Sequence, residues 1–96
     1  MNNVNDKNKS ICIPRVENNI SIEYIFRKLS QLNIGKISKI IEIPLKNDSN
    51  YKRIIVKIKN VNKENKIFNK LDKGEHVNIV HNMPWYWKIV QTVNKD

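Results

Sequence analysis

The spacing of apolar residues is the feature that most constrains how this chain can fold. Apolar and polar side chains alternate along residues 10–16 and 51–59, and this period of two is typical of β-strands. In residues 21–34 the apolar side chains recur every three or four positions instead, as on one face of a helix. That face comprises Ile22, Ile25, Phe26, Leu29 and Leu32.

Capping residues mark the ends of two predicted helices. Ser21 suits the N-cap of the first helix, and Gly35 suits its C-terminal end. A second, shorter helix is predicted over residues 62–73, with Asn62 as its N-cap and Gly74 as its stop. Its narrow buried stripe comprises Ile67, Phe68 and Leu71.

Residues 37–45 are rich in isoleucine and are predicted to form a strand whose register is open. In one register Ile41, Ile43 and Leu45 face the core. In the other, a bulge near Ile40 and Ile41 switches the face. The pattern alone does not choose between them.

The last two strand-like segments are residues 76–81 and 85–92. A turn at residues 82–84 separates them, which predicts an antiparallel hairpin. The order strand, helix, strand, strand, helix, strand indicates an α+β, ferredoxin-like sandwich. Such a fold has a four-stranded antiparallel sheet with two helices on one face, while the other face is open.

Length and composition exclude several classes of protein. With 96 residues, the chain is expected to form one domain over residues 10–93, after a disordered arm at 1–9 and before a tail at 94–96. Cys12 is the only cysteine, so an internal disulfide is impossible and a reducing, intracellular compartment is the default. The sequence shows neither a membrane-spanning apolar run nor a signal peptide.

Catalytic and metal-binding patterns are also missing from the sequence. His76 and His81 would point to opposite faces of a strand, which disfavours a metal pair. Gly35 and Gly74 are the only glycines, too few for a glycine-rich phosphate loop. We therefore expect neither an enzyme nor a bound cofactor.

The net charge of +9 is a weaker clue than it looks. Asn, Ile and Lys make up 47 of the 96 residues and alanine is absent, a bias typical of A+T-rich coding. Part of the lysine excess therefore reflects codon usage. Arginine is less easily explained in this way, and the chain has three: Arg15, Arg27 and Arg53.

Residues 11–16 (ICIPRV) and 51–58 (YKRIIVKI) sit in two short consensus patterns, so the chain resembles the RNA recognition motif. The resemblance implies a sandwich whose open sheet face binds single-stranded RNA. Where the family places its three stacking rings, this chain has Cys12, Arg53 and Ile55. Base stacking would then need rings elsewhere.

Residues 13–16 (IPRV), together with Val80 and residues 85–88 (WYWK), resemble segments of short recognition-motif-like proteins of large DNA viruses of algae and protists. The family's usual length implies that residues 85–92 form the fourth strand of the sheet and residues 76–81 an added strand. The resemblance also implies a location in the host cytoplasm or viral factory, or in the virion.

Trp85, Tyr86 and Trp87 have two interpretations. Two of the three rings fill the core, or Tyr86 or the tryptophan pair forms a stacking platform displaced from the usual strands. The basic residues near the open face form either a nucleic-acid contact or an ordinary solvated surface, and Arg53 could instead pair with Glu42. The candidate binding residues are Cys12, Arg15, Lys52, Arg53, Ile55, Lys57, Tyr86 and Lys88.

The expected function is a small nucleic-acid-binding module for single-stranded RNA, with DNA as the other form of ligand. A rival hypothesis is a protein-interaction module, a virion or accessory component that docks a partner or a second copy through an open face bearing Ile55. Nonspecific DNA compaction through the lysine excess is a third. No membrane partner is expected.

Overall fold

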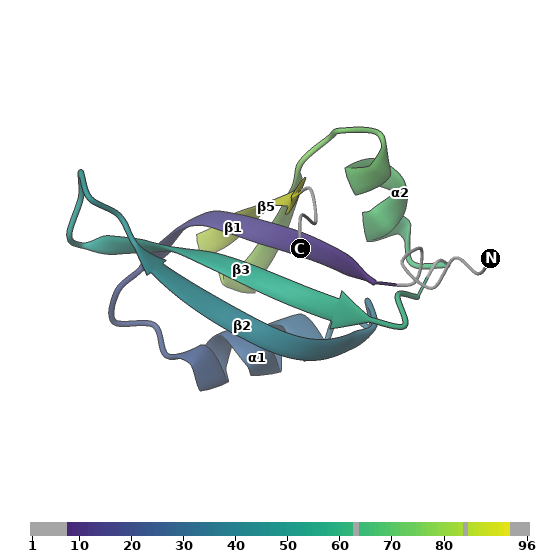
Figure 1. The fold of residues 1–96 in the computed structure, drawn as a ribbon, viewed down its shortest axis with the longest axis horizontal. Coiled ribbons are helices and arrows are strands. Elements are labelled where there is room, and N and C mark those ends of the chain that lie inside the picture. The colour runs from purple at the N-terminus through teal and green to yellow at the C-terminus, as the bar shows by residue number, and fades with distance from the viewer. Residues whose placement is uncertain (1–7, 63, 84, 93–96) are drawn as a thin grey trace.

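The computed structural model describes residues 8–62, 64–83 and 85–92, which form a five-stranded antiparallel sheet and two helices (Figure 1). In chain order the elements are β1 (Lys9–Glu17), α1 (Ile22–Ser30), β2 (Lys36–Pro44), β3 (Tyr51–Lys59), α2 (Lys66–Asp72), β4 (Val77–Asn82) and β5 (Trp85–Thr92). None of the described helices is long and apolar enough to cross a membrane.

The strand order is β2-β3-β1-β5-β4, and every neighbouring pair is antiparallel. β1 lies in the middle, between β3 and β5. The predicted α+β topology is confirmed: the arrangement is consistent with a ferredoxin-like sheet that carries an extra strand. As expected, residues 85–92 pair with the first strand, and the added strand lies at the edge beyond them.

One hydrophobic core lies between the sheet and the helices. Alternate residues of β1 and β3 point into it, and each helix contributes two buried side chains. Both helices therefore cover the same face of the sheet, and we call the opposite face the open face. The core comprises Ile11, Ile13, Val16, Ile25, Leu29, Ile34, Ile54, Val56, Ile58, Phe68, Leu71, Trp87 and Ile89.

Both helices are shorter than the sequence predicts. α1 ends at Ser30, and the following turn contains Asn33 at a φ of 56°, so this asparagine reverses the chain before Gly35. The predicted helical face is also partly wrong, because Phe26 is 48% exposed. The predicted N-cap of α1 is confirmed: the hydroxyl of Ser21 accepts a hydrogen bond from the Tyr24 amide.

The N-cap of α2 is Asn65, not Asn62. The Asn65 side chain accepts a hydrogen bond from the Ile67 amide at 2.8 Å, the geometry of a cap. Asn62 instead closes a turn. Its side-chain oxygen accepts a hydrogen bond from the backbone N–H of Glu64, and its backbone N–H donates to the Ile34 carbonyl. Asparagine has the same capping preference at either position, and the contacts made by Asn62 in its turn leave the cap to Asn65.

The register of β2 differs from both sequence alternatives. The irregularity lies between Ile37 and Lys39, so Ser38 is the extra residue. Beyond it, Ile40 pairs with core-facing Val56, whereas Ile41 pairs with Ile55 on the open face. The prediction that Ile41, Ile43 and Leu45 face the core is therefore wrong. The alternative prediction of a bulge near Ile40 and Ile41 is also wrong.

The predicted arm and tail fall mostly outside the described residues, which exclude residues 1–7 and 93–96. Lys9, assigned to the arm, belongs to β1, and its ammonium lies 3.4 Å from the Asp72 carboxylate. Lys63 of the predicted second helix and Pro84 of the predicted turn also lie outside the described residues.

Gly35 occupies a position that admits no side chain. Its φ is +141°, and a Cβ atom there would lie 2.7 Å from Cγ2 of Ile58. We expect Gly35→Ala to lower the free energy of unfolding by about 2–4 kcal/mol, since it adds backbone strain to overpacking. Urea denaturation measures this change. The control is Gly74→Ala, because Gly74 has a φ of +84° but no neighbour within 4 Å. Equal losses in the two variants would contradict the packing argument.

Candidate functional site

An apolar row crosses the centre of the open face. The strand registers align Ile41, Ile55, Cys12 and Val90 as neighbours on four successive strands. Ile55 is half-buried, and Cys12 is only 8% exposed. Of the two predicted contact residues in this row, Ile55 can therefore touch a ligand, whereas Cys12 mainly packs.

Cationic side chains lie on both sides of this apolar row. On one side, Lys57 of β3 pairs with Lys39 of β2 and with Ser10 of β1. On the other side, Arg53 pairs with Ile43. Lys88 is exposed and shares a face with Val90, since residues two apart on a strand point the same way. Three of the predicted site residues, Arg53, Lys57 and Lys88, thus lie on one surface.

The Cys12 thiol is not set up as a nucleophile. Burial raises its pKa above the usual range, and the nearby positive charge of Arg53 only partly opposes this. In the described part of the chain, no three or more His, Cys, Asp or Glu side chains gather where they could hold a metal ion.

Lys52 is not a surface residue, so its prediction as a binding residue is wrong. It points to the helix side, is 6% exposed, and donates to the Ile20 carbonyl at 2.6 Å. It also pairs with Glu42 at 2.5 Å. The sequence suggests Glu42 as a possible partner of Arg53. Glu42 pairs with Lys52 instead, because Arg53 lies on the opposite face of the sheet.

We expect Lys52→Met to destabilise the fold by roughly 2 kcal/mol, because the part-buried Ile20 carbonyl loses its donor and Glu42 loses its counter-charge. Urea denaturation measures the loss. Lys36→Met is the control, since Lys36 is exposed at the start of β2. If Lys52→Met is as stable as the control, the structural role assigned to this ammonium is incorrect.

The three rings that begin β5 have different environments. Trp87 is buried and stacks on His81, with ring centroids 4.2 Å apart and planes at 14°. Tyr24 meets Trp87 edge-on, and its hydroxyl lies 3.0 Å from the His81 carbonyl oxygen. Tyr86 and Trp85 are 56% and 66% exposed. Only Trp87 of these three rings fills the core, so the prediction that two of the three rings are buried is wrong.

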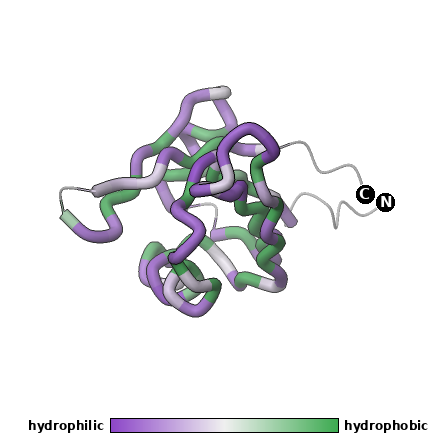
Figure 2. The backbone as a smooth tube through the Cα atoms, turned by 90° about the vertical axis from the view of Figure 1, so that its left-hand side faces the viewer, coloured by the Kyte–Doolittle hydropathy of each residue, from purple (hydrophilic) through white to green (hydrophobic). Residues whose placement is uncertain are grey.

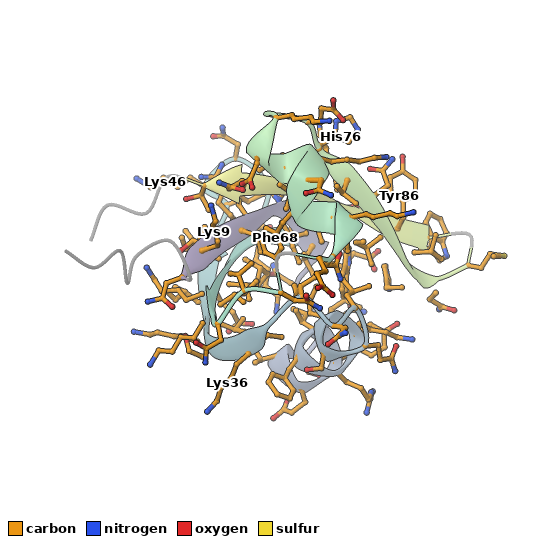
Figure 3. The ribbon with its side chains drawn as sticks, turned by 90° about the vertical axis from the view of Figure 1, so that its right-hand side faces the viewer. Lys9, Lys36, Lys46, Phe68, His76 and Tyr86 are labelled. Carbon is orange, nitrogen blue, oxygen red and sulfur yellow. The ribbon has the colours of Figure 1, made fainter. Side chains whose placement is uncertain are left out.

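The exposed rings belong to the β4–β5 hairpin, which projects from the body of the molecule (Figures 2 and 3). Tyr86 pairs with Val80, also exposed, and shares a face with Lys88. By this alternation Tyr86 lies on the open face, as one sequence alternative proposed. Trp85 follows a register shift after Val80, so the regular alternation of the hairpin does not extend to it.

A groove of about 150 Å³ lies at this end of the sheet. Arg15 enters it because the β1–β3 register shifts after Ile13, where Pro14 interrupts the strand. The Arg15 guanidinium lies 4.1 Å above the centre of the Tyr51 ring and 2.8 Å from the Asp48 carboxylate. The residues that line this groove are Arg15, Val16, Glu17, Tyr51, His81, Trp85, Tyr86 and Trp87.

The sequence predicted Arg15 and Tyr86 as binding residues but not Tyr51 or Glu17, which line the same groove. The two missed residues are paired across β1 and β3. Pairing of the strand ends would have placed Glu17 beside Tyr51, but this pairing can be predicted only when the register after Pro14 is known.

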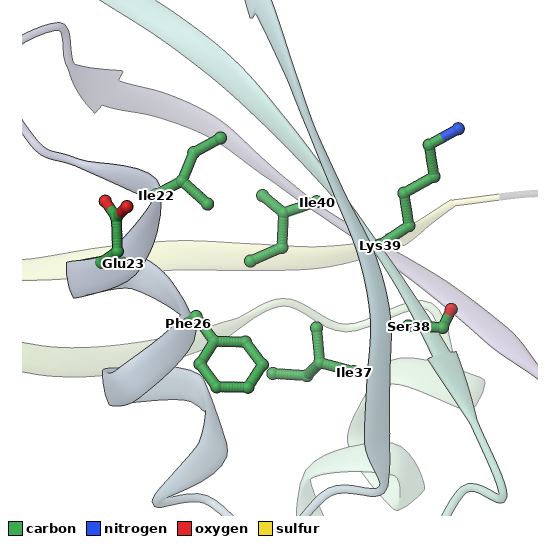
Figure 4. A pocket seen from close by; sticks show the side chains of 7 residues that line it. All are labelled: Ile22, Glu23, Phe26, Ile37, Ser38, Lys39 and Ile40. Atoms are coloured by element: carbon green, nitrogen blue, oxygen red, sulfur yellow. The ribbon is translucent and has the colours of Figure 1, made fainter.

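A second, apolar groove of about 350 Å³ separates α1 from the edge strand β2 (Figure 4). Ile22 and Phe26 of the helix face Ile37 and Ile40 of the strand across it, so Phe26 is half-exposed as part of the groove wall. The groove lies between the helix and the sheet, and Lys39, which belongs to one of the cationic rows, lies at its margin.

No protein-family model matches the chain, and neither a curated protein nor a solved structure shows a significant match to it. The open face and the groove beside it therefore have to be interpreted from the chemistry of their own side chains.

The stability of the hairpin should depend on the charge of His81. Burial lowers the pKa of this imidazole; Glu17 opposes the shift and Lys28 adds to it. The unfolded chain therefore takes up a proton at His81 more readily than the folded chain does. The folded state keeps its full stability above about pH 6.5 and loses stability as the pH falls through the lowered pKa of His81.

We therefore expect His81→Phe, which keeps a ring on Trp87, to lose less thermal stability than the wild type between pH 7 and pH 5. Melting temperatures across this range provide the measurement, and His76→Phe is the control because His76 is exposed outside β4. Parallel melting curves for His81→Phe and the wild type would argue against a titrating role of His81.

Proposed function

We propose that the chain is an RNA-recognition-motif-like domain that binds single-stranded nucleic acid, with RNA as the expected form, on its open sheet face. The observation that carries the proposal is the pattern of charge on that face. Arg53, Lys57 and Lys88 flank an apolar centre, and the described residues of these rows include no Asp or Glu. A surface rich in cations attracts phosphates.

The spacing of these charges suits an extended strand of nucleic acid. Arg53 and Lys57 are four residues apart on β3, which is about 13 Å along a strand. The apolar row with Ile41 and Ile55 lies between them and can contact base faces while the cations hold the backbone. Aliphatic side chains replace stacking rings here, which forgoes about 1–3 kcal/mol per base. Charge should therefore dominate the affinity.

The same surface suggests a second candidate function, a protein-interaction module. Ile43 is 40% exposed beside Ile41 and Ile55, so the apolar area could dock a partner or a second copy. We favour nucleic acid because the apolar area is bordered by cations on both sides. The likeness to proteins of large DNA viruses, and the viral location it implies, remain predictions.

A salt titration tests the favoured function. Affinity for a single-stranded oligonucleotide should fall linearly when plotted as log affinity against log salt. Arg53→Ala should weaken binding roughly three- to tenfold and reduce the slope by about 0.7, the loss of one phosphate contact. Fluorescence anisotropy with a labelled oligonucleotide measures both quantities.

Arg27→Ala is the matched control, because it removes the same charge from α1, on the far side of the sheet. It should leave the slope nearly unchanged. Equal effects of the two substitutions would mean that net charge alone attracts the oligonucleotide. Binding that is insensitive to salt, or a stable dimer in sedimentation that hides this face, would favour the protein-interaction module.

A further inference from the structure

The groove beside the open face concentrates planar groups that the proposed phosphate contacts do not use. Trp85 and Tyr86 are the most exposed rings of the described residues, and both line it. Across the groove lie Tyr51 and the guanidinium of Arg15, two further planar groups. Leaving rings exposed in this way costs free energy unless a ligand covers them.

Arg15 presents a prepared stacking surface. Tyr51 supports one face of its guanidinium and Asp48 holds its edge, yet the Arg15 side chain remains 60% exposed. A guanidinium held in this way can stack on a base with its free face and loses little further side-chain freedom on binding. Its charge is partly satisfied by Asp48, which makes it a poorer phosphate ligand than Arg53.

Glu17 places a carboxylate in the groove. This carboxylate lines the groove beside Tyr51 and disfavours a phosphate there by repulsion. It can instead accept a hydrogen bond from an exocyclic amino group of a base. Uracil lacks that group, and its one donor on this edge, N3–H, lies between two carbonyl oxygens that the carboxylate repels.

From these features we infer that the groove of Arg15, Glu17, Tyr51, Trp85 and Tyr86 is a slot for one unpaired base bearing an exocyclic amino group. The inference rests on the proposed function, since the phosphates of the same strand would lie on the neighbouring cations. A volume of about 150 Å³ suits a single base, below the range of roughly 300–1,000 Å³ for sites of drug-sized ligands.

The first test compares an oligocytidine with a fully abasic oligonucleotide of equal length and charge. Trp85→Leu should weaken binding of the oligocytidine roughly five- to a hundredfold, the range expected for one stacked base, and leave binding of the abasic strand unchanged. Phe26→Leu is the control, because Phe26 is an exposed ring on α1 outside this groove.

The second test addresses selectivity. The wild type should bind oligocytidine more tightly than oligouridine, and Glu17→Gln should reduce this preference, since an amide can donate to the uracil carbonyl. Both strands carry the same charge, so electrostatic attraction cancels in the comparison.

The outcomes separate the slot from the proposed function. If no oligonucleotide binds in a salt-dependent manner, both are wrong. If binding is salt-dependent and weakened by Arg53→Ala, but Trp85→Leu behaves like Phe26→Leu, the open face binds nucleic acid and the slot is wrong. Selectivity that persists unchanged in Glu17→Gln would overturn the role of the carboxylate.

Discussion

The pairing of β1 with β3 is the constraint on which the rest of this structure depends. Residues of β1 and β3 are matched so that Ile11 lies opposite Val56 under the helices, while Cys12 lies opposite Ile55 on the open face. Because successive side chains of a strand point to opposite faces, this one register decides both the core and the exposed surface. β2 and β5 then attach to the outer edges of this pair.

The interruption of that pairing is as important as the pairing itself. At Pro14 the β1–β3 ladder shifts, so Arg15 leaves the regular alternation and reaches the ring of Tyr51. The hairpin supplies Trp85 and Tyr86 at the same end of the sheet. Regular pairing thus builds a charged surface with an apolar centre, and the irregular end adds the planar groups that this centre lacks.

Several local features were beyond sequence reasoning for definable reasons. Asn62 and Asn65 are equivalent caps by propensity, and α2 begins after the second because Asn62 is used in a turn against Ile34. The phase of β2 depends on one extra residue, Ser38, whose hydroxyl donates to the Lys57 carbonyl. The sequence predicts Lys52 as a surface cation, whereas the fold buries its ammonium against the Ile20 carbonyl.

The sequence by itself determined the element order and the faces of β1 and β3, because period-two alternation depends only on neighbouring residues. It therefore assigned Arg53, Ile55 and Lys57 to the open face correctly. Only the tertiary structure decided that Arg15 and Trp85, far apart in the chain, line one groove. The reason is physical: strand order and register arise from long-range pairing, and a slip of one residue exchanges the two faces.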